Sequence, residues 1–403
     1  MPKSPPLSVD AVPELEPVVE VFRALLGDGH ELGASLAVHR GGRQLLSAAG
    51  GWADTARTRP FTDRTLSRVF SAGKPIAALT ALTAVADGQL TLDDPLTRWW
   101  PEYGAHGKEA TTLRHVLSHR AGLPAYSDAA DAADATAATD ATDATDATGT
   151  AYSAEGIDPL DQAALLADLV SSPPIAPPGQ VIAEHALTYG TLIDGILEQA
   201  GAPDARTAAA RLAALWGAGA APGDSALELH FGVERDEHPR VADLEIVDDA
   251  WVARYLARDD GRRMLDRPHG NLDPERLNSA PWRSASMPAT GLFTTARSLS
   301  RFYDDVHRPD GRVAARLGTE LHAEYLAPQA VGHDLFVDGP VEWSLGLRVD
   351  GGEIGMGGIG GSSAWYSPAH DYSFAFVTRS LGTFARVDAL ADAVEAALPA
   401  PAR

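Results

Sequence analysis

Phe70-Ser-Ala-Gly-Lys-Pro-Ile-Ala-Ala-Leu79 places a serine three residues before a lysine. Small and apolar residues continue at intervals of three to four until Asp87-Gly88, which predicts a buried helix over 71–88. Two residues three positions apart share one face of a helix, so the Lys74 amine can reach the Ser71 hydroxyl and remove its proton. The positive end of the helix also favours negative charge there. The stretch therefore predicts a nucleophilic serine.

Strand patterns lie on both sides of this helix. Residues 34–51 indicate a hairpin whose turn contains Gly41-Gly42. Further strands are predicted at 343–349, 353–358, 363–367 and 372–378, and further helices at 113–118, 158–171, 187–200 and 387–398. This order predicts an α+β fold in which both ends of the chain build one antiparallel sheet flanked by helices, with a mainly helical region inserted.

The chain divides accordingly into four parts. Residues 1–20 are expected to be an N-terminal tail, and 21–95 together with 290–398 are expected to form the sheet region. The helical region would then span 96–289. Within it, 128–150 is rich in Asp, Ala and Thr and contains no basic or large apolar residue. Such a segment cannot bury enough apolar surface to offset its ordering entropy, so we expect a disordered acidic insertion that folding does not require.

Composition excludes several classes of protein. The 403 residues include no cysteine, which excludes a disulfide scaffold, and their formal net charge of -22 repels nucleic acid. No apolar run is long enough for a membrane span, and Met1-Pro-Lys-Ser-Pro-Pro-Leu7 lacks the apolar core of a secretion signal. The histidines show no metal-binding spacing. We therefore expect a cytoplasmic protein with no membrane partner, metal or cofactor.

Several motifs of the chain resemble the penicillin-recognising serine hydrolases. Besides Phe70–Leu79, these motifs are Asp87-Gly-Gln-Leu-Thr-Leu-Asp-Asp-Pro-Leu96, Leu113-Arg-His-Val-Leu-Ser-His-Arg-Ala-Gly-Leu-Pro124, Gly291-Leu-Phe-Thr-Thr-Ala-Arg-Ser-Leu-Ser-Arg-Phe-Tyr303, Trp343-Ser-Leu-Gly-Leu347 and Gly357-Gly-Ile-Gly-Gly-Ser362. The branch to which they are most similar contains the class C β-lactamases and the family VIII esterases. The resemblance implies a β-lactamase/transpeptidase-like fold with Ser71 as nucleophile.

The second motif of this family, which carries a tyrosine, is altered. It falls at Pro178-Gly-Gln-Val-Ile-Ala-Glu-His-Ala-Leu-Thr-Tyr-Gly190, where Glu184 stands at the tyrosine position. A glutamate there would pair with Lys74 and hold the lysine charged, or would itself accept the serine proton. If the register is shifted, Tyr189 takes the role of the tyrosine. In either register, His185 is a polar packing residue or a residue that contacts the substrate.

The third motif, a Lys/His-x-Gly triplet, is also altered. Met356 stands where the family has a cation or an indole, and Gly358 is its glycine. Without the cation a substrate carboxylate loses its anchor, which argues against penicillins and favours neutral esters or thioesters. The resemblance also implies an oxyanion hole made by the backbone N–H of Ser71 and that of Gly360 or Gly361.

Together these motifs predict a serine-dependent acyl-enzyme hydrolase or transacylase in specialised metabolism. Its partners would be a small-molecule acyl donor and an amine or alcohol acceptor. The alternative is a protein of the same fold that binds its ligand without turnover, or with very slow turnover, because the tyrosine and the cation are missing.

Overall fold

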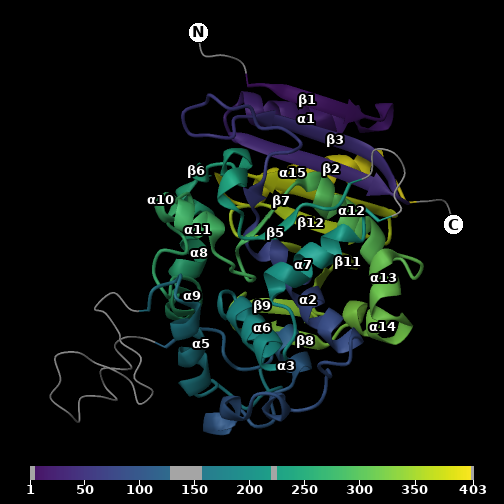
Figure 1. The fold of residues 1–403 in the computed structure, drawn as a ribbon. Coiled ribbons are helices and arrows are strands. Elements are labelled where there is room, and N and C mark those ends of the chain that lie inside the picture. The colour runs from purple at the N-terminus through teal and green to yellow at the C-terminus, as the bar shows by residue number, and fades with distance from the viewer. Residues whose placement is uncertain (1–4, 128–156, 219–224, 401–403) are drawn as a thin grey trace.

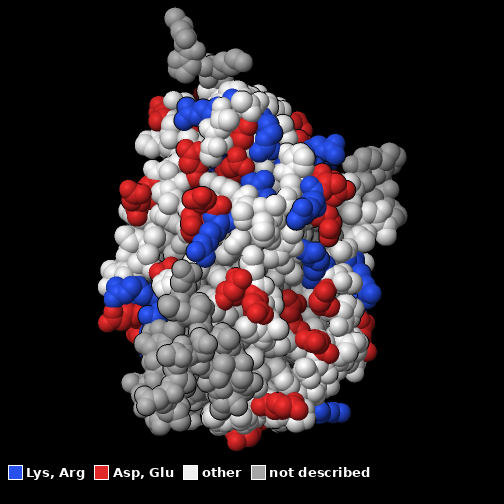
Figure 2. Space-filling view, turned by 60° about the vertical axis from the view of Figure 1, so that its left-hand side comes forward, with Lys and Arg blue, Asp and Glu red and all other residues white. Residues whose placement is uncertain are grey.

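The computed structural model describes residues 5–127, 157–218 and 225–400 (Figure 1). The acidic insertion predicted at 128–150 lies outside the described residues. Among the residues that are described, no helix is long and apolar enough to cross a membrane. Basic and acidic side chains are interspersed over the described part of the face shown in Figure 2, so that face presents no continuous basic surface to a polyanion.

The centre of the molecule is a nine-stranded antiparallel sheet with strand order β1-β3-β2-β13-β12-β11-β10-β9-β8. Its strands are β1 (Leu7–Ala11), β2 (Gly33–Arg40), β3 (Arg43–Gly51), β8 (Ala330–Asp334), β9 (Gly339–Trp343), β10 (Arg348–Asp350), β11 (Glu353–Gly357), β12 (Ser363–Ser367) and β13 (Tyr372–Thr378). The first strands pair with the last ones through β2 and β13, where Ala34 lies opposite Thr378 (Figure 1). The predicted sheet built from both ends of the chain is therefore confirmed.

The expected N-terminal tail over 1–20 is wrong. β1 pairs with β3 along its whole length, and α1 (Glu16–Gly27) begins within the same range. The helix buries Val18 and Phe22 among other apolar residues and packs against α15. The sequence signal was weak because β1 lies at the sheet edge, where three of its five side chains face solvent.

The predicted hairpin is present as β2 and β3. Gly41 and Gly42 form its turn with φ of 59° and 82°, the left-handed conformation at both positions that a two-residue hairpin turn requires. Successive residues of β2 then face opposite sides of the sheet. Leu36 and Val38 pack with α1 and α15 (Ala385–Ala397), and Ala37 packs with the helices on the other side.

The second face of the sheet is covered by α2 (Lys74–Ala86) and α12 (Ala296–Val306), and α6 (Thr188–Gln199) packs on α2. The remaining α-helices are α3 (Leu113–Leu117), α5 (Gln162–Ser171), α7 (Ala205–Ala214), α8 (Ala253–Leu256), α9 (Asp259–Leu265), α10 (Pro274–Leu277), α11 (Ala280–Ser284), α13 (Arg312–Leu317) and α14 (Thr319–Leu326). Almost every residue of α2 is buried, so this helix is a rigid support for its N-terminal end.

Two small sheets were not predicted. One has the order β4-β7-β5 and consists of β4 (Ser67–Arg68), β7 (Leu292–Thr294) and β5 (Leu229–Phe231); the other pairs β6 (Glu245–Ile246) with β14 (Ser380–Leu381). Their strands are two or three residues long, too short for a recognisable alternation of apolar and polar residues. Both sheets bind the helical part of the chain to the large sheet.

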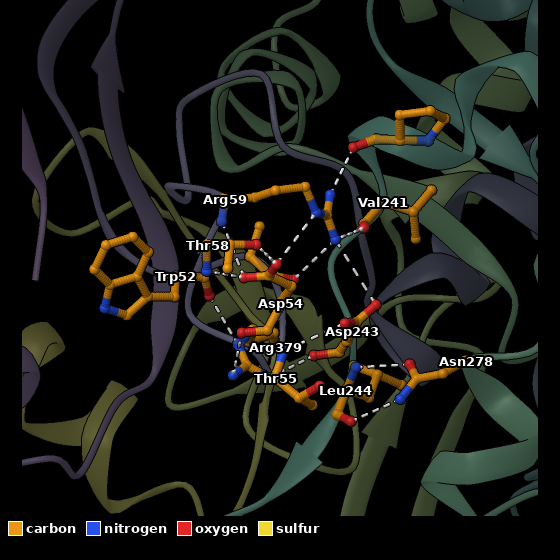
Figure 3. Close-up of polar contacts among 12 residues, drawn as sticks. Trp52, Asp54, Thr55, Thr58, Arg59, Val241, Asp243, Leu244, Asn278 and Arg379 are labelled. Carbon is orange, nitrogen blue, oxygen red and sulfur yellow. Dashed lines mark hydrogen bonds and ion pairs between the residues drawn. The ribbon is translucent and has the colours of Figure 1, made fainter.

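A buried polar network reinforces this junction (Figure 3). The Arg379 guanidinium, which is fully buried, donates hydrogen bonds to the backbone carbonyls of Trp52 at 2.8 Å, Asp243 at 2.7 Å and Asp54 at 3.3 Å. It also pairs with Glu245 at 2.9 Å. One side chain thus joins the end of β13, the loop after β3 and the segment that leads into β6.

Candidate active site

Ser71 lies in a 3₁₀ turn, Phe70–Gly73, directly before α2. Phe70 has φ of 49°, a left-handed conformation that is costly for a bulky residue and marks a constrained turn. Pro75 in the first turn of α2 suits the beginning of a helix. The turn and the helix together place Ser71 at the wall of a cavity and Lys74 beneath it.

The structure brings the predicted serine and lysine together. Lys74 Nζ lies 2.7 Å from Ser71 Oγ, and the lysine side chain is fully buried. Burial lowers the pKa of Lys74 below the ordinary lysine value, because the charged form loses hydration. A lysine of lowered pKa gives up its proton more readily, so Lys74 is suited to act as a base.

Glu184 contacts the same lysine. Its Oε1 lies 3.0 Å from Lys74 Nζ, and the residue is 6% exposed. Its negative charge raises the pKa of Lys74, with a smaller contribution from Asp334, but burial outweighs both. Glu184 does favour the charged lysine, as expected, but this effect on the pKa of Lys74 is smaller than the opposing effect of burial.

Backbone contacts fix the segment that carries Glu184. The Ala183 N–H donates to the His119 carbonyl at 3.0 Å, and the Ala186 N–H donates to the Glu184 carbonyl at 2.9 Å. The segment lies immediately before α6 and bridges to β8 through Ile182. Its short connections leave the carboxylate little freedom to move away from the lysine.

His185 and Tyr189 were expected to contact substrate, but the structure places both behind the cavity wall. His185 is fully buried with its Nδ1 3.3 Å from His119 Nδ1, and burial lowers the pKa of His185 to about 3, so its ring is neutral. Tyr189 is also fully buried and donates to the Leu117 carbonyl at 3.3 Å. Tyr189 is buried with the apolar residues of α6, and His185 accepts from the Leu123 N–H at 3.4 Å beside His119, so both are packing residues.

The cavity beside Ser71 has a volume of about 440 Å³. Its apolar walls include Tyr255, Leu265, Leu272, Phe336, Trp343 and Met356. The rings of Tyr255 and Phe336 stack with their centres 5.1 Å apart. Met356 lies on β11 as an apolar wall, at the position where the resemblance implies a cation.

The glycine turn after β11 does not place Gly360 and Gly361 where the predicted oxyanion hole requires them. A Cβ on Gly358 would lie 2.0 Å from the Val69 carbonyl oxygen, so only glycine allows the turn to approach the backbone before Ser71. Gly360 and Gly361 do not line the cavity; they face Leu381 and Arg386 instead. Ile359 lines the cavity in their place and packs against the apolar cluster that contains Phe70.

A family model described as Beta-lactamase matches residues 18–398. The chain belongs to the beta-lactamase family. It is similar to "Esterase/beta-lactamase LipL" of Mycobacterium tuberculosis, with 28% identity over 396 residues that cover 92% of this chain and 82% of that protein. Its structure is similar to a penicillin-binding protein homolog from Caulobacter crescentus, with a TM-score of 0.76, 26% identity and coverage of 98% of this chain and 100% of that one.

A family VIII carboxylesterase has the same fold, with a TM-score of 0.77 and 21% identity, covering 97% of this chain and 100% of that one. The predicted β-lactamase/transpeptidase-like fold is therefore confirmed.

Besides Ile359, the sequence of this beta-lactamase-family protein did not indicate Asp334, which supports the cavity wall. Asp334, at the end of β8, is fully buried and accepts hydrogen bonds from the Trp343 indole at 3.2 Å and from the backbone N–H groups of Phe336 at 2.8 Å and Val337 at 3.0 Å. All three partners line the cavity. The signal that was available is the motif that begins at Trp343, since a buried indole N–H needs an acceptor.

Gly358→Ala is expected to lower the rate of acylation of this beta-lactamase-family protein about 10- to 100-fold, because the new Cβ must push the turn away from Ser71. The labelling rate with a fluorophosphonate, together with the melting temperature, checks this. Gly339→Ala is the matched control, since a Cβ there meets nothing within 4 Å. Equal labelling rates in the two variants would contradict the prediction.

Proposed function

We propose that this protein is a serine hydrolase or acyltransferase that forms an acyl-enzyme on Ser71 from neutral small-molecule esters or thioesters. The observation that carries the proposal is the 2.7 Å contact between Ser71 Oγ and the buried Lys74 amine at the wall of an apolar cavity. A nucleophile with an adjacent base of lowered pKa is what acyl transfer requires.

In the first step Ser71 Oγ attacks the carbonyl carbon and its proton passes to neutral Lys74. Burial lowers the pKa of Lys74 and so favours the neutral amine that the attack needs, and the negative charge of Glu184 at 3.0 Å then stabilises the ammonium that forms. When the tetrahedral intermediate collapses, the bond to the leaving alcohol or thiol breaks, and Lys74 returns the proton to the leaving oxygen or sulfur.

Two backbone N–H groups are suited to stabilise the oxyanion. Ser71 lies in the first turn before α2, where N–H groups have no partner within the helix. We assign the second donor to the Ile359 N–H, because Ile359 lines the cavity, whereas Gly360 and Gly361, to which the resemblance gave this role, do not. Donors fixed before the reaction act most strongly in a site shielded from water.

The cavity wall at Met356 supports a neutral substrate. Two arginines also line the cavity, but Arg348 pairs with Asp350 at 3.1 Å and Arg254 donates to the Val337 carbonyl at 3.4 Å. Met356 offers no positive charge to a substrate carboxylate, and Tyr255 and Phe336 present apolar surface to an acyl chain or an alcohol group. The name of the relative LipL describes an esterase as well as a β-lactamase, which supports an ester as substrate. We extend the proposal to transfer of the acyl group to an amine or alcohol, in specialised metabolism, where such an acceptor enters the cavity before water.

Intact-mass measurement tests this function directly. The protein is incubated with nitrophenyl esters and thioesters of increasing acyl length, and with an analogue that carries a carboxylate. We expect a mass increase equal to one acyl group, and turnover of the neutral esters at least about tenfold faster than that of the analogue. Added amine or alcohol should yield the transfer product. Absence of both adduct and turnover would support the alternative of a non-catalytic binding protein.

A further inference from the structure

A second buried arginine contacts the glycine turn. Arg386 lies in the first turn of α15 and is 6% exposed. Its Nη2 donates hydrogen bonds to the Gly360 carbonyl at 2.7 Å and to the Ser380 carbonyl at 2.9 Å. A buried guanidinium is costly unless a negative charge neutralises it and acceptors bind its N–H groups. The two carbonyls supply such acceptors for Arg386.

The charge of Arg386 is matched by Glu31, which follows α1 and is 2% exposed. Glu31 Oε2 lies 2.6 Å from Arg386 Nη1 and 2.7 Å from Thr378 Oγ1. Its Oε1 accepts from Ser380 Oγ at 2.5 Å and from the Gly33 N–H at 2.9 Å. Every oxygen of the carboxylate therefore has two partners, and the arginine is held in one orientation.

The contact with Gly360 restrains the residue next to it. Gly360 has φ of 103°, and its carbonyl also accepts from the Gly382 N–H at 3.2 Å. The Gly361 N–H closes the turn by donating to the Gly358 carbonyl at 3.0 Å. The Gly360 carbonyl and the Gly361 N–H belong to one peptide group, and the Gly358 carbonyl and the Ile359 N–H belong to another. Arg386 holds the first peptide group, and the hydrogen bond from Gly361 to Gly358 transmits that restraint to the second one, which carries the Ile359 N–H.

We propose that Arg386 is a positioning residue for the oxyanion hole. It acts through Gly360 and keeps the Ile359 N–H directed at the carbonyl oxygen of the substrate, while Glu31 keeps Arg386 in place. The inference rests on the proposed function, because an oxyanion hole matters only if Ser71 forms an acyl-enzyme. A shift of the donor by about 1 Å is enough to cost a large part of the rate.

Arg379 supplies a matched control. It is also a fully buried arginine with a carboxylate partner and backbone carbonyl acceptors, as Figure 3 shows for its contacts with Trp52, Asp54 and Asp243. None of these residues lines the cavity. Replacing Arg379 therefore disturbs the interior to a similar degree without touching the glycine turn.

The experiment compares Arg386→Lys with Arg379→Lys in the full chain. Lysine keeps the charge but cannot donate in the forked geometry of a guanidinium. We expect both variants to melt at a lower temperature. Only Arg386→Lys should lower kcat for ester turnover, by about 10- to 100-fold with KM within about threefold of wild type. A boronic acid, whose tetrahedral adduct occupies the oxyanion hole, should bind less tightly to Arg386→Lys by a similar factor.

Equal losses of kcat in the two lysine variants, or a boronic acid affinity that Arg386→Lys leaves unchanged, would overturn the inference alone. If Arg386→Lys does not fold, Glu31→Gln replaces it, with Glu245→Gln as control, and the same split in kcat is expected. Wild-type protein that neither reacts with a fluorophosphonate nor turns over esters would overturn the proposed function, and the inference with it.

Discussion

Ser71→Ala is expected to lower ester turnover by about 10⁴-fold or more and to abolish covalent labelling by a fluorophosphonate. Without the hydroxyl no acyl-enzyme can form, and removal of a nucleophile is among the most damaging changes to an enzyme. The melting temperature should stay within about 3 °C of wild type, because only a hydroxyl at the cavity wall is removed and Lys74 keeps its contact with Glu184.

Stopped assays with nitrophenyl esters and intact-mass analysis measure both effects. Ser118→Ala is a suitable control, since Ser118 is fully buried, donates to the Arg114 carbonyl at 2.7 Å and does not line the cavity. The control should keep its full labelling. Labelling that persists in Ser71→Ala would assign the nucleophile to another residue.

The second large effect is expected for Glu184→Gln. The substitution leaves Lys74 buried without a negative partner, so the pKa of Lys74, already lowered by burial, falls further. We expect kcat/KM at its high-pH plateau to fall about 100-fold, because the ammonium that forms on Lys74 during the attack loses its negative neighbour, and the rising limb of the pH profile to move to lower pH. A profile of kcat/KM from pH 5 to 10 measures both changes.

The stability of Glu184→Gln should depend on pH in a direction that can be worked out. A lysine whose folded-state pKa lies below its unfolded value takes up a proton on unfolding. As the pH falls below the ordinary lysine pKa, this proton uptake stabilises the unfolded state relative to the folded one. The free energy of unfolding of the variant should therefore keep decreasing to a lower pH than that of wild type, and its total decrease below the ordinary lysine pKa should be larger. Denaturant titrations at several pH values measure this difference.

Glu184→Tyr is the matched comparison, because it restores the residue that the family motif carries. We expect it to retain more acylation activity than Glu184→Gln, since a phenol can also carry a proton. Kinetics and a pH profile that neither substitution changes would place Glu184 outside the reaction.

The cluster of Ser71, Lys74 and Glu184 was predictable because each of these positions is defined by residues close to it in the sequence. Ser71 and Lys74 are one helical turn apart, and the motif that precedes α6 fixed the register of Glu184. The roles expected of His185 and Tyr189 were not realised, because burial is decided by how α6 packs against other helices. A sequence that lies before a helix does not show which of its neighbours faces the cavity.

The glycine turn after β11 shows a similar limit. The stretch from Gly357 to Ser362 indicated a turn of special backbone geometry, but not which peptide of that turn faces Ser71. The answer depends on contacts with Val69, Arg386 and Gly382, which come from distant parts of the chain. The short edge strand β1 escaped prediction for the same reason, since it is defined by its pairing with β3.

The pairing of β2 with β13 also sets the time at which reactivity can arise. Ser71 leaves the ribosome long before Gly358 and Arg386, and the strands between them must close onto β2 before the oxyanion donors face the serine. Contacts so distant in sequence form late in folding. A nascent or refolding chain should therefore stay inert to fluorophosphonates until the sheet is closed. The time at which covalent labelling begins would then report when the last stage of folding is complete.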